Sequence, residues 1–405
     1  MNNVLGPAPS QAQFDDAIAR GAFREANLLA EQQIRKTPKD PDAWRNRALA
    51  ADRIGNIPRA LRAWEEISLL SGETGATCYE RARLLFRAGR TGVAQLMINR
   101  GIHLAPTDAK ILRFKLEIEE ALGRPEASAA SISNAYDSLC EADGGAISTE
   151  LKLLVARAKW IAADEDSAYE LYTRIAAADS NRLGARVAAM RCATRFFYDD
   201  DAAIPRARKD FQTHLKELIK EAGQDADFRR RVLPFLTAGT LFRLPYQGRN
   251  DMDLMRQYGE LLASCMRASF PNASLATAEM APPPAAGRRI RVGVAGSFFQ
   301  RHASWNNRRG FFYNLDRTVF ETYLYDLGTE FDDYTAYAYG AFEHVRKDDG
   351  FIRDWIWRIR NDRLDILIYP ELGMNATVLA IAALRLAPVQ ARMAGHPETC
   401  GLPTI

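Results

Sequence analysis

Four glycines spaced 34 residues apart constrain the first third of the chain more than any other feature. They are Gly21, Gly55, Gly89 and Gly123, and a small residue follows each of them five positions later, at Ala26, Ala60, Ala94 and Ser128. A period of this length, held over four copies, is typical of stacked pairs of helices. Glycine suits the turn inside each pair, and a small side chain lets the paired helices approach each other.

Further positions keep the same period. Ala48 and Ala82 occupy equivalent places, and Pro38 and Pro106 end units, with Gly72 in the corresponding place between them. This is the spacing of tetratricopeptide (TPR) repeats, in which each helix pair buries its apolar face against the next pair. We therefore predict an α-solenoid with a concave groove. The groove is suited to an extended peptide or protein; the alternative is that the helices only support or dimerise another part of the molecule.

The helical pattern extends beyond the regular repeats. After residue 124 the period loosens, although apolar residues keep a three- and four-residue spacing as far as residue 197. We predict TPR and degenerate helical repeats over 7–197 and a helical connection over 198–274. The Pro- and Ala-rich run over 275–288 is predicted to be an interdomain linker.

From residue 289 the pattern alternates between strands and helices. The runs RIRVGVAGS (289–297) and DILIYPE (365–371) predict buried parallel strands, with helical patterns between them. Successive β-α units predict an α/β, Rossmann-like sheet over 289–405, and ligands of such sheets bind at the carboxyl ends of the strands. Gly293 and Gly296 are too few and wrongly spaced for a dinucleotide fingerprint, so NAD binding is disfavoured.

Three side chains that follow predicted strands are candidates for chemistry. His302 lies in the loop after the first strand, where a histidine acts as a general base, donates to a phosphate or caps the turn. His396 lies in a Gly-His-Pro turn (395–397), which is either structural or presents backbone amides and the Thr399 hydroxyl to a ligand. Glu371 is a candidate base, but its position favours a hydrogen bond to a neighbouring loop.

Three segments that accompany the repeats resemble the O-GlcNAc transferase, or SPINDLY-like, family of protein glycosyltransferases. They are RIRVGVAGSFFQRH, DRLDILIYPELGM and RLAPVQARMAGHPETCGLPTI. The last is the most specific, because an Arg-x-Ala-Pro-x-Gln turn leads into Gly-(His/Tyr)-Pro-x-Thr-x-Gly. The resemblance implies a GT-B fold of two Rossmann-like lobes, with 289–405 as the first, acceptor-side lobe. It also implies sugar transfer from UDP-GlcNAc or another UDP-hexose to Ser/Thr or Asn side chains, without a metal or a permanently bound cofactor.

The resemblance also assigns site residues. His302 matches the family histidine that faces the active centre and is a candidate for acid/base work. The residues matched to the substrate and donor cleft are Gly395, His396, Pro397 and Thr399, together with Gly373 and Met374. Many members have a Gly-(His/Tyr)-Thr turn where this chain has Gly373 and Met374. The version found here is closer to a bacterial branch that transfers hexose to asparagine, so both sugar and acceptor residue stay open.

Composition and charge limit which binding partners and which cellular compartment we expect. Lys and Arg number 54 against 51 Asp and Glu, which gives no reason to expect nucleic acid or an acidic membrane as the main partner. The chain begins without a secretory signal, has no apolar run long enough to span a bilayer, and carries five widely spaced cysteines that lack metal-ligand spacing. We predict a cytoplasmic protein, with acceptor proteins or peptides as partners and a homodimer as a further possibility.

The end of the sequence bears on activity. Members of the family continue past the last matching segment into a second lobe, which holds most of the UDP contacts. We therefore expect the 405-residue chain to be inactive or nearly so by itself. The alternative function is a non-catalytic TPR scaffold that recruits protein partners.

Overall fold

The computed structural model of the chain describes residues 9–141, 147–275, 287–347, 350–393, 395–396 and 399–405. Contacts between residues divide the chain into two units, Met1–Leu171 and Tyr172–Ile405. The domain boundaries predicted from the sequence stay predictions, and most of the predicted linker lies outside the described residues. None of the described helices is both long enough and apolar enough to cross a bilayer.

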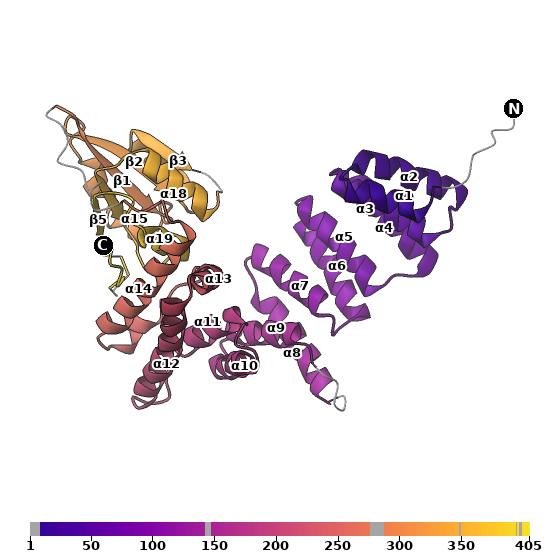
Figure 1. Ribbon diagram of the computed structural model, residues 1–405, viewed down its shortest axis with the longest axis horizontal. Helices are drawn as coiled ribbons and strands as arrows, with labels where there is room; N and C mark the ends of the chain where they lie inside the picture. Colours follow the sequence, from indigo (N-terminus) through magenta and orange to yellow (C-terminus); the bar gives the residue numbers. More distant parts are fainter. Residues whose placement is uncertain (1–8, 142–146, 276–286, 348–349, 394, 397–398) are drawn as a thin grey trace. The chain divides into compact units, whose positions relative to one another are not determined.

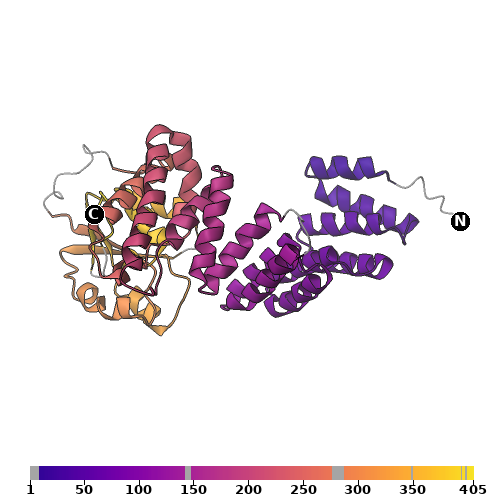
Figure 2. The same ribbon diagram turned by 90° about the horizontal axis from the view of Figure 1, so that it is seen from below.

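The first unit is built from successive helices (Figures 1 and 2). They are α1 (Gln11–Ala19), α2 (Phe23–Lys36), α3 (Pro41–Arg53), α4 (Ile57–Ser71), α5 (Gly75–Arg87), α6 (Thr91–Leu104), α7 (Ala109–Ala121), α8 (Glu126–Glu141) and α9 (Thr149–Ile161), with the first residues of α10 (Glu165–Ala178). Each helix from α1 to α8 contacts the next one, and α5, α7 and α9 also contact one another in turn. This nearest-neighbour packing confirms the predicted solenoid.

The periodic glycines lie where the spacing predicted them, in the turn inside each helix pair. Gly21, Gly55, Gly89 and Gly123 all have left-handed backbones, with φ between 71° and 75°. The small residues five positions later are fully buried at the start of the second helix of each pair. The period therefore follows from one backbone geometry, which glycine adopts at no steric cost.

The structure also contains a fifth pair that the glycine pattern did not reveal. Ala163 takes the left-handed place between α9 and α10 with φ of 59°, and Ala168, five positions later, is fully buried. Residue 163 lies 40 positions after Gly123 instead of 34, because α8 and the connection after it are longer than their counterparts. This insertion explains why the 34-residue period is not kept after residue 124.

An ion pair recurs at equivalent positions in the repeats. Arg83 in α5 pairs with Asp52 in α3 at 2.6 Å, and Arg157 in α9 pairs with Glu120 in α7. Each arginine lies six residues before its turn residue, and each carboxylate lies three residues before its own. The recurrence supports Ala163 as the counterpart of the glycines.

Substitutions at two turn positions are expected to have opposite effects on stability. Ala163→Gly should stabilise the first unit by about 0.5 to 1 kcal/mol, because a left-handed alanine costs more than the extra chain entropy of glycine. Gly89→Ala should destabilise it by a similar amount, since nothing lies within 4 Å of the added methyl group and only the backbone changes. Urea unfolding of the two variants measures both; effects of the same sign would contradict this explanation.

The second unit begins with the rest of α10, and a group of packed helices follows. They are α11 (Leu183–Cys192), α12 (Ala203–Gln224), α13 (Ala226–Leu236), the 3₁₀ helix η1 (Leu244–Gln247) and α14 (Met252–Ser269). Helices α12, α13 and α14 contact one another, and α11 contacts α12 and α13. The described residues between the repeats and the sheet thus form mainly helices.

A five-stranded parallel sheet follows. Its strands are β1 (Ile290–Gly296), β2 (Phe320–Asp326), β3 (His344–Lys347), β4 (Ile366–Tyr369) and β5 (Val389–Arg392), and the intervening helices are α15 (Ala303–Asn306), α16 (Arg309–Tyr313), α17 (Asp333–Gly340), α18 (Ile352–Asn361) and α19 (Ala376–Ala382). The order is β3-β2-β1-β4-β5, and all four pairings are parallel. The strand order reverses between β1 and β4, which is where open α/β sheets bind ligands.

Aromatic side chains pack against one face of the sheet. Val294 and Leu324 pack with aromatic side chains of α15 and α16, notably Trp305 and Phe312, in one buried cluster. Helices α18 and α19 contact each other, and α19 also contacts α14.

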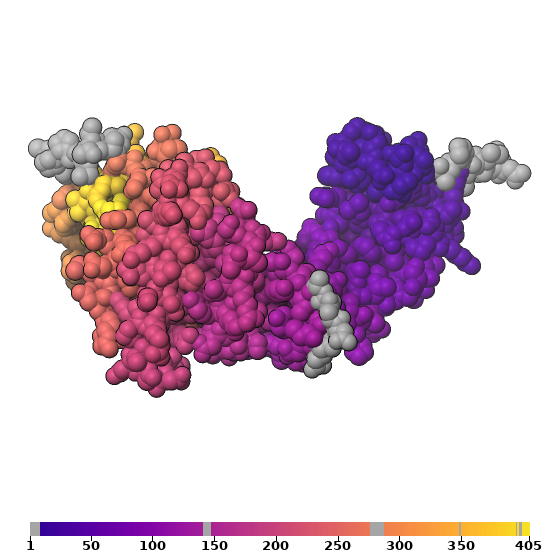
Figure 3. Space-filling model, turned by 60° about the horizontal axis from the view of Figure 1, so that its bottom comes forward, coloured from indigo at the N-terminus to yellow at the C-terminus, as the bar shows by residue number. Residues whose placement is uncertain are grey.

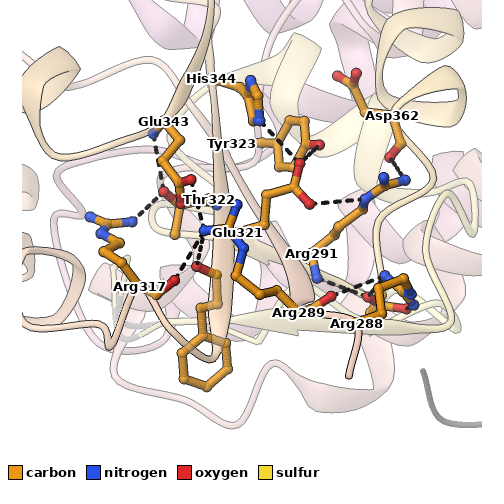
Figure 4. Close-up of polar contacts among 12 residues, drawn as sticks. Arg288, Arg289, Arg291, Arg317, Glu321, Thr322, Tyr323, Glu343, His344 and Asp362 are labelled. Carbon is orange, nitrogen blue, oxygen red and sulfur yellow. Dashed lines mark hydrogen bonds and ion pairs between the residues drawn. The ribbon is translucent and has the colours of Figure 1, made fainter. Parts of the chain in front are cut away.

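At the amino ends of the strands, a polar network joins Glu321 to the Arg291, Tyr323 and His344 side chains (Figure 4).

The C-terminal residues are fixed by the Arg-x-Ala-Pro-x-Gln turn. The buried side chain of Gln390 accepts a hydrogen bond from the Leu386 amide at 2.8 Å and donates to the Thr404 carbonyl at 3.2 Å. Figure 3 shows part of the C-terminal segment, in yellow, at the surface. The most specific segment of the family resemblance thus has a structural task, which is to hold the end of the chain against the sheet.

Candidate functional site

Loops that follow three strands meet at the carboxyl edge of the sheet, around the side chain of Glu371. Glu371 comes two residues after β4 and is 1% exposed. Its carboxylate accepts a hydrogen bond from the backbone amide of Ser297, one residue after β1, at 2.5 Å. This contact spans the point where the strand order reverses, and it agrees with the hydrogen-bonding role that the sequence favoured for Glu371.

Glycines allow the loops to come this close. A methyl group added at Gly296 would lie 2.4 Å from the Glu371 carboxylate, and one added at Gly395 would lie 2.9 Å from the Glu371 Cα atom. A methyl group at Gly328, in the loop after β2, would lie 2.4 Å from the Ser297 carbonyl oxygen. A methyl group at Gly328 or Gly395 would require the backbone to move, and one at Gly296 would displace the Glu371 carboxylate.

The environment of Glu371 favours its neutral form. Burial raises the pKa of Glu371 to about 7, and the nearby negative charge of Asp326 acts in the same direction. The Ser297 amide and the positive charge of Arg308 oppose this shift. Arg308 is itself buried, and burial lowers the pKa of its guanidinium group. The edge therefore holds a carboxyl group that can take up or release a proton near neutral pH.

Asp326 is the second buried carboxylate at this edge. It ends β2, is 1% exposed, and accepts hydrogen bonds from the Gly328 amide and the Tyr339 hydroxyl, both at 2.8 Å. Lys347 pairs with it at 3.3 Å. Sequence reasoning assigned no role to Ser297, Arg308 or Asp326. A polar residue at the end of a buried strand, as at Asp326, or directly after one, as at Ser297, was a usable signal.

His302 has a structural role in the loop after β1. Its ring nitrogen Nδ1 accepts a hydrogen bond from the Ser304 amide at 3.1 Å and thereby caps α15. The ring stacks on Phe298, with 4.5 Å between centroids. Within the described residues, these contacts do not join His302 to Glu371 or His396. Capping was one of the three roles left open by the sequence, and an additional chemical role stays a proposal.

Substitutions can separate the capping role of His302 from any other. His302→Ala should destabilise the sheet region by about 1 kcal/mol, because the cap of α15 is lost. His302→Asn should recover most of this loss, because asparagine is a good capping residue. Hydrogen exchange in residues 303–306 measures the effect, and equal exchange rates in both variants would contradict the capping role.

The turn after β5 is packed against the helical part of the same unit. His396 is 3% exposed, its ring lies 4.4 Å from that of Phe242, and its carbonyl accepts a hydrogen bond from Arg392 at 2.9 Å. The Thr399 side chain is exposed, and its hydroxyl accepts a hydrogen bond from the Gly401 amide at 3.3 Å. Pro397 lies outside the described residues.

The other predicted cleft residues lie in the turn after β4. Gly373 has a left-handed backbone with φ of 98°, and the Met374 amide donates to the Glu371 carbonyl at 3.4 Å. The structure thus brings Gly373, Met374 and Gly395 together around Glu371. In the described part of the chain, no group of three His, Cys, Asp or Glu residues lies close enough to hold a metal ion.

No family model and no curated protein matches this chain. Among solved structures, it is similar to a mutant O-GlcNAc transferase of Thermobaculum terrenum, at 16% identity and a TM-score of 0.36, over 90% of this chain and 52% of that one. It is also similar to MamA of Desulfovibrio magneticus, at 16% identity and 0.34, over 42% of this chain and 94% of that one. A third similar structure is a TPR repeat-containing protein of Cytophaga hutchinsonii, at 10% identity and a TM-score of 0.43. The match covers 64% of this chain and 95% of that one.

The matches differ in how much of the other protein this chain covers. The chain spans about half the length of the Thermobaculum transferase, whereas it covers nearly all of the other two structures. At these identities and TM-scores the matches decide nothing about activity. The helical repeats are established by the geometry of the four glycine turns and by the order of the helix contacts.

Proposed function

We propose that this chain is the acceptor-binding part of a protein glycosyltransferase. The enzyme transfers a sugar from UDP-GlcNAc or a UDP-hexose to Ser/Thr or Asn side chains of proteins, and residues 289–405 form the Rossmann-like first lobe of a GT-B fold. One observation carries the proposal. The three segments that resemble the family come from distant parts of the lobe, yet the loops after β1, β4 and β5 meet around Glu371 where the strand order reverses.

The residues at this edge suit a site that positions an acceptor. Glu371 and the Ser297 amide hold two loops together, and the glycines at 296, 373 and 395 leave the backbone of these loops free of side chains. His302 and His396 provide imidazole groups on the loops after β1 and β5. In our proposal, His302 takes up the proton of the acceptor side chain. The UDP-sugar donor is a substrate, and the proposed site has no resident cofactor or metal.

The repeats supply the second part of the proposed function. A solenoid presents an extended surface to a polypeptide, and its paired arginines and carboxylates offer hydrogen-bonding groups along the first helices of successive pairs. Acceptor proteins are therefore the proposed partners, in the cytoplasm, with no role assigned to nucleic acid or membrane.

A transfer assay tests this proposal. The protein purified from its source cells is incubated with radiolabelled UDP-GlcNAc or UDP-glucose and with protein from cells that lack it. We expect label in acceptor protein, and we expect His302→Asn to reduce the rate at least tenfold while the fold is retained. Absence of transfer from either donor, with the protein shown to be folded, would contradict the proposal.

A non-catalytic scaffold is the second candidate, and one observation favours it. The contacts of both histidines are structural, because His302 caps α15 and His396 packs against Phe242. If the scaffold function is correct, His302→Asn leaves the cellular function unchanged, whereas substitutions on the repeat surface abolish it. A complementation assay in source cells distinguishes the two candidates.

A further inference from the structure

We infer that the sheet-containing unit has a second binding site, for a diphosphate group, at the amino edge of its sheet. The site is a cavity of about 390 Å³ next to the first residues of β1 and β4. Four arginines line it: Arg288, Arg291, Arg360 and Arg363. They come from the start of β1 and from the end of α18 and the turn after it, so the fold itself brings these charges together.

The cavity lining contains more arginines than carboxylates. Among the described residues, Asp365 is the one acidic residue in the lining. It accepts two hydrogen bonds from the Arg288 guanidinium group, at 2.7 and 2.9 Å, and one from the Arg291 amide, at 2.8 Å. The Arg291 side chain reaches Glu321 at 3.3 Å, outside the cavity lining (Figure 4). Arg363 has no carboxylate partner among the residues that the structure describes. A bound anion would give Arg363 a partner of opposite charge.

Arg363 is held in an unfavourable backbone conformation. It directly follows the C-cap of α18 with φ of 49°, a position where helices usually have glycine. A left-handed residue with a side chain costs stability, and such costs cluster at functional sites. Here the conformation places a long cationic side chain at the cavity.

The lining also indicates the class of ligand. Guanidinium groups bind phosphate oxygens through paired hydrogen bonds, and several of them in one cavity suit a ligand with more than one phosphate. The rest of the lining is apolar, from Leu275, Leu364, Leu386 and Pro388. These side chains can pack against a nucleoside, so the diphosphate belongs either to inorganic pyrophosphate or to a nucleoside diphosphate.

This cavity is separate from the candidate site around Glu371. The strands are parallel, and the lining residues from 288 onward precede or begin β1, β4 or β5, whereas Ser297 and Glu371 follow β1 and β4. The length of β1 alone places the two edges about 20 Å apart. The inference therefore does not depend on the proposed glycosyltransferase activity.

Calorimetric titration of the purified chain with sodium pyrophosphate, and separately with UDP, tests the inference at constant ionic strength. We expect a dissociation constant of about 100 µM or lower for at least one of the two ligands. Arg363→Gly should weaken binding at least fivefold and, because it relieves the left-handed backbone, raise the melting temperature of the unit. Loss of binding therefore could not be attributed to misfolding.

Arg353→Gln is the matched control. It removes an exposed arginine near the other end of α18, outside the cavity, and should leave the affinity unchanged. Tighter binding of UDP than of pyrophosphate, with the same loss in Arg363→Gly, would assign the ligand as a nucleoside diphosphate; equal affinities would assign free diphosphate. No binding of either ligand up to 1 mM, or equal weakening in both variants, would overturn the inference.

Discussion

Replacing Gly401 with alanine is expected to destabilise the sheet-containing unit by about 3 kcal/mol, since overpacking adds to the cost of a left-handed alanine. Gly401 has φ of 63°, and a methyl group there would lie 2.0 Å from the Met255 carbonyl oxygen in α14. A methyl group at Gly259, one turn further along α14, would lie 2.2 Å from the Gly401 carbonyl oxygen. The two backbones touch, so neither side can yield without separating the C-terminal segment from the helix.

Two comparison variants isolate the steric part of this effect. Gly248→Ala introduces alanine at φ of 62° in open space and should cost about 1 kcal/mol. Gly259→Ala adds a methyl group within a helix, where alanine is otherwise favoured, and should still be destabilising. Urea unfolding, followed by hydrogen exchange of α14, measures all three. Equal costs for Gly401→Ala and Gly248→Ala would show that the C-terminal segment is not tightly docked.

Replacing Glu371 with glutamine is expected to stabilise the unit at high pH and to have little effect at low pH. The pKa of Glu371 is raised from 4.5 to about 7 by burial, so the folded state binds the proton more tightly than the unfolded state. The favourable contribution is complete below pH 4.5 and is lost as pH rises through 7. At 1.36 kcal/mol per pKa unit, the ionised carboxylate costs about 3 kcal/mol at pH 8.5, and glutamine avoids this cost.

Glu321→Gln provides a control with the opposite sign. The pKa of Glu321 is lowered, first by its hydrogen bond from Tyr323, so its contribution is present above its unfolded pKa and is lost as pH falls through the folded value. Unfolding of both variants and the parent at pH 5 and pH 8.5 gives the comparison. Both values lie above the unfolded pKa of Glu321, so Glu321→Gln should destabilise the unit equally at both, whereas Glu371→Gln should stabilise it mainly at pH 8.5. If Glu371→Gln has the same effect at both pH values, the proposed protonation of the buried carboxyl group is wrong.

The regular elements of this chain were predictable because the local backbone conformation restricts which residues occur at certain positions. A glycine every 34 residues indicates a turn with a left-handed backbone in each repeat, and the run DILIYPE indicates a buried parallel strand. The fifth helix pair escaped the pattern because Ala163 accepts the same backbone conformation at an energetic cost and because an insertion shifts it.

The candidate site was predictable only in part. Polar residues after strands pointed to the carboxyl edge of the sheet, and His302 and Glu371 were found in this way. The contact of Glu371 with the Ser297 amide depends on strand order, which brings β1 and β4 together across 74 residues of sequence. The packing of His396 on Phe242 depends on how the helices meet the sheet, and no local pattern records it.

The central claim is that this protein takes part in attaching sugars to other proteins. The most direct test is mass spectrometry of glycopeptides from source cells that carry the parent gene, a deletion of it, or His302→Asn at normal protein levels. We predict that a defined set of peptides carries N-acetylhexosamine or hexose with the parent gene and loses it in both altered strains. An identical set of glycopeptides in the parent and deletion strains would contradict the claim.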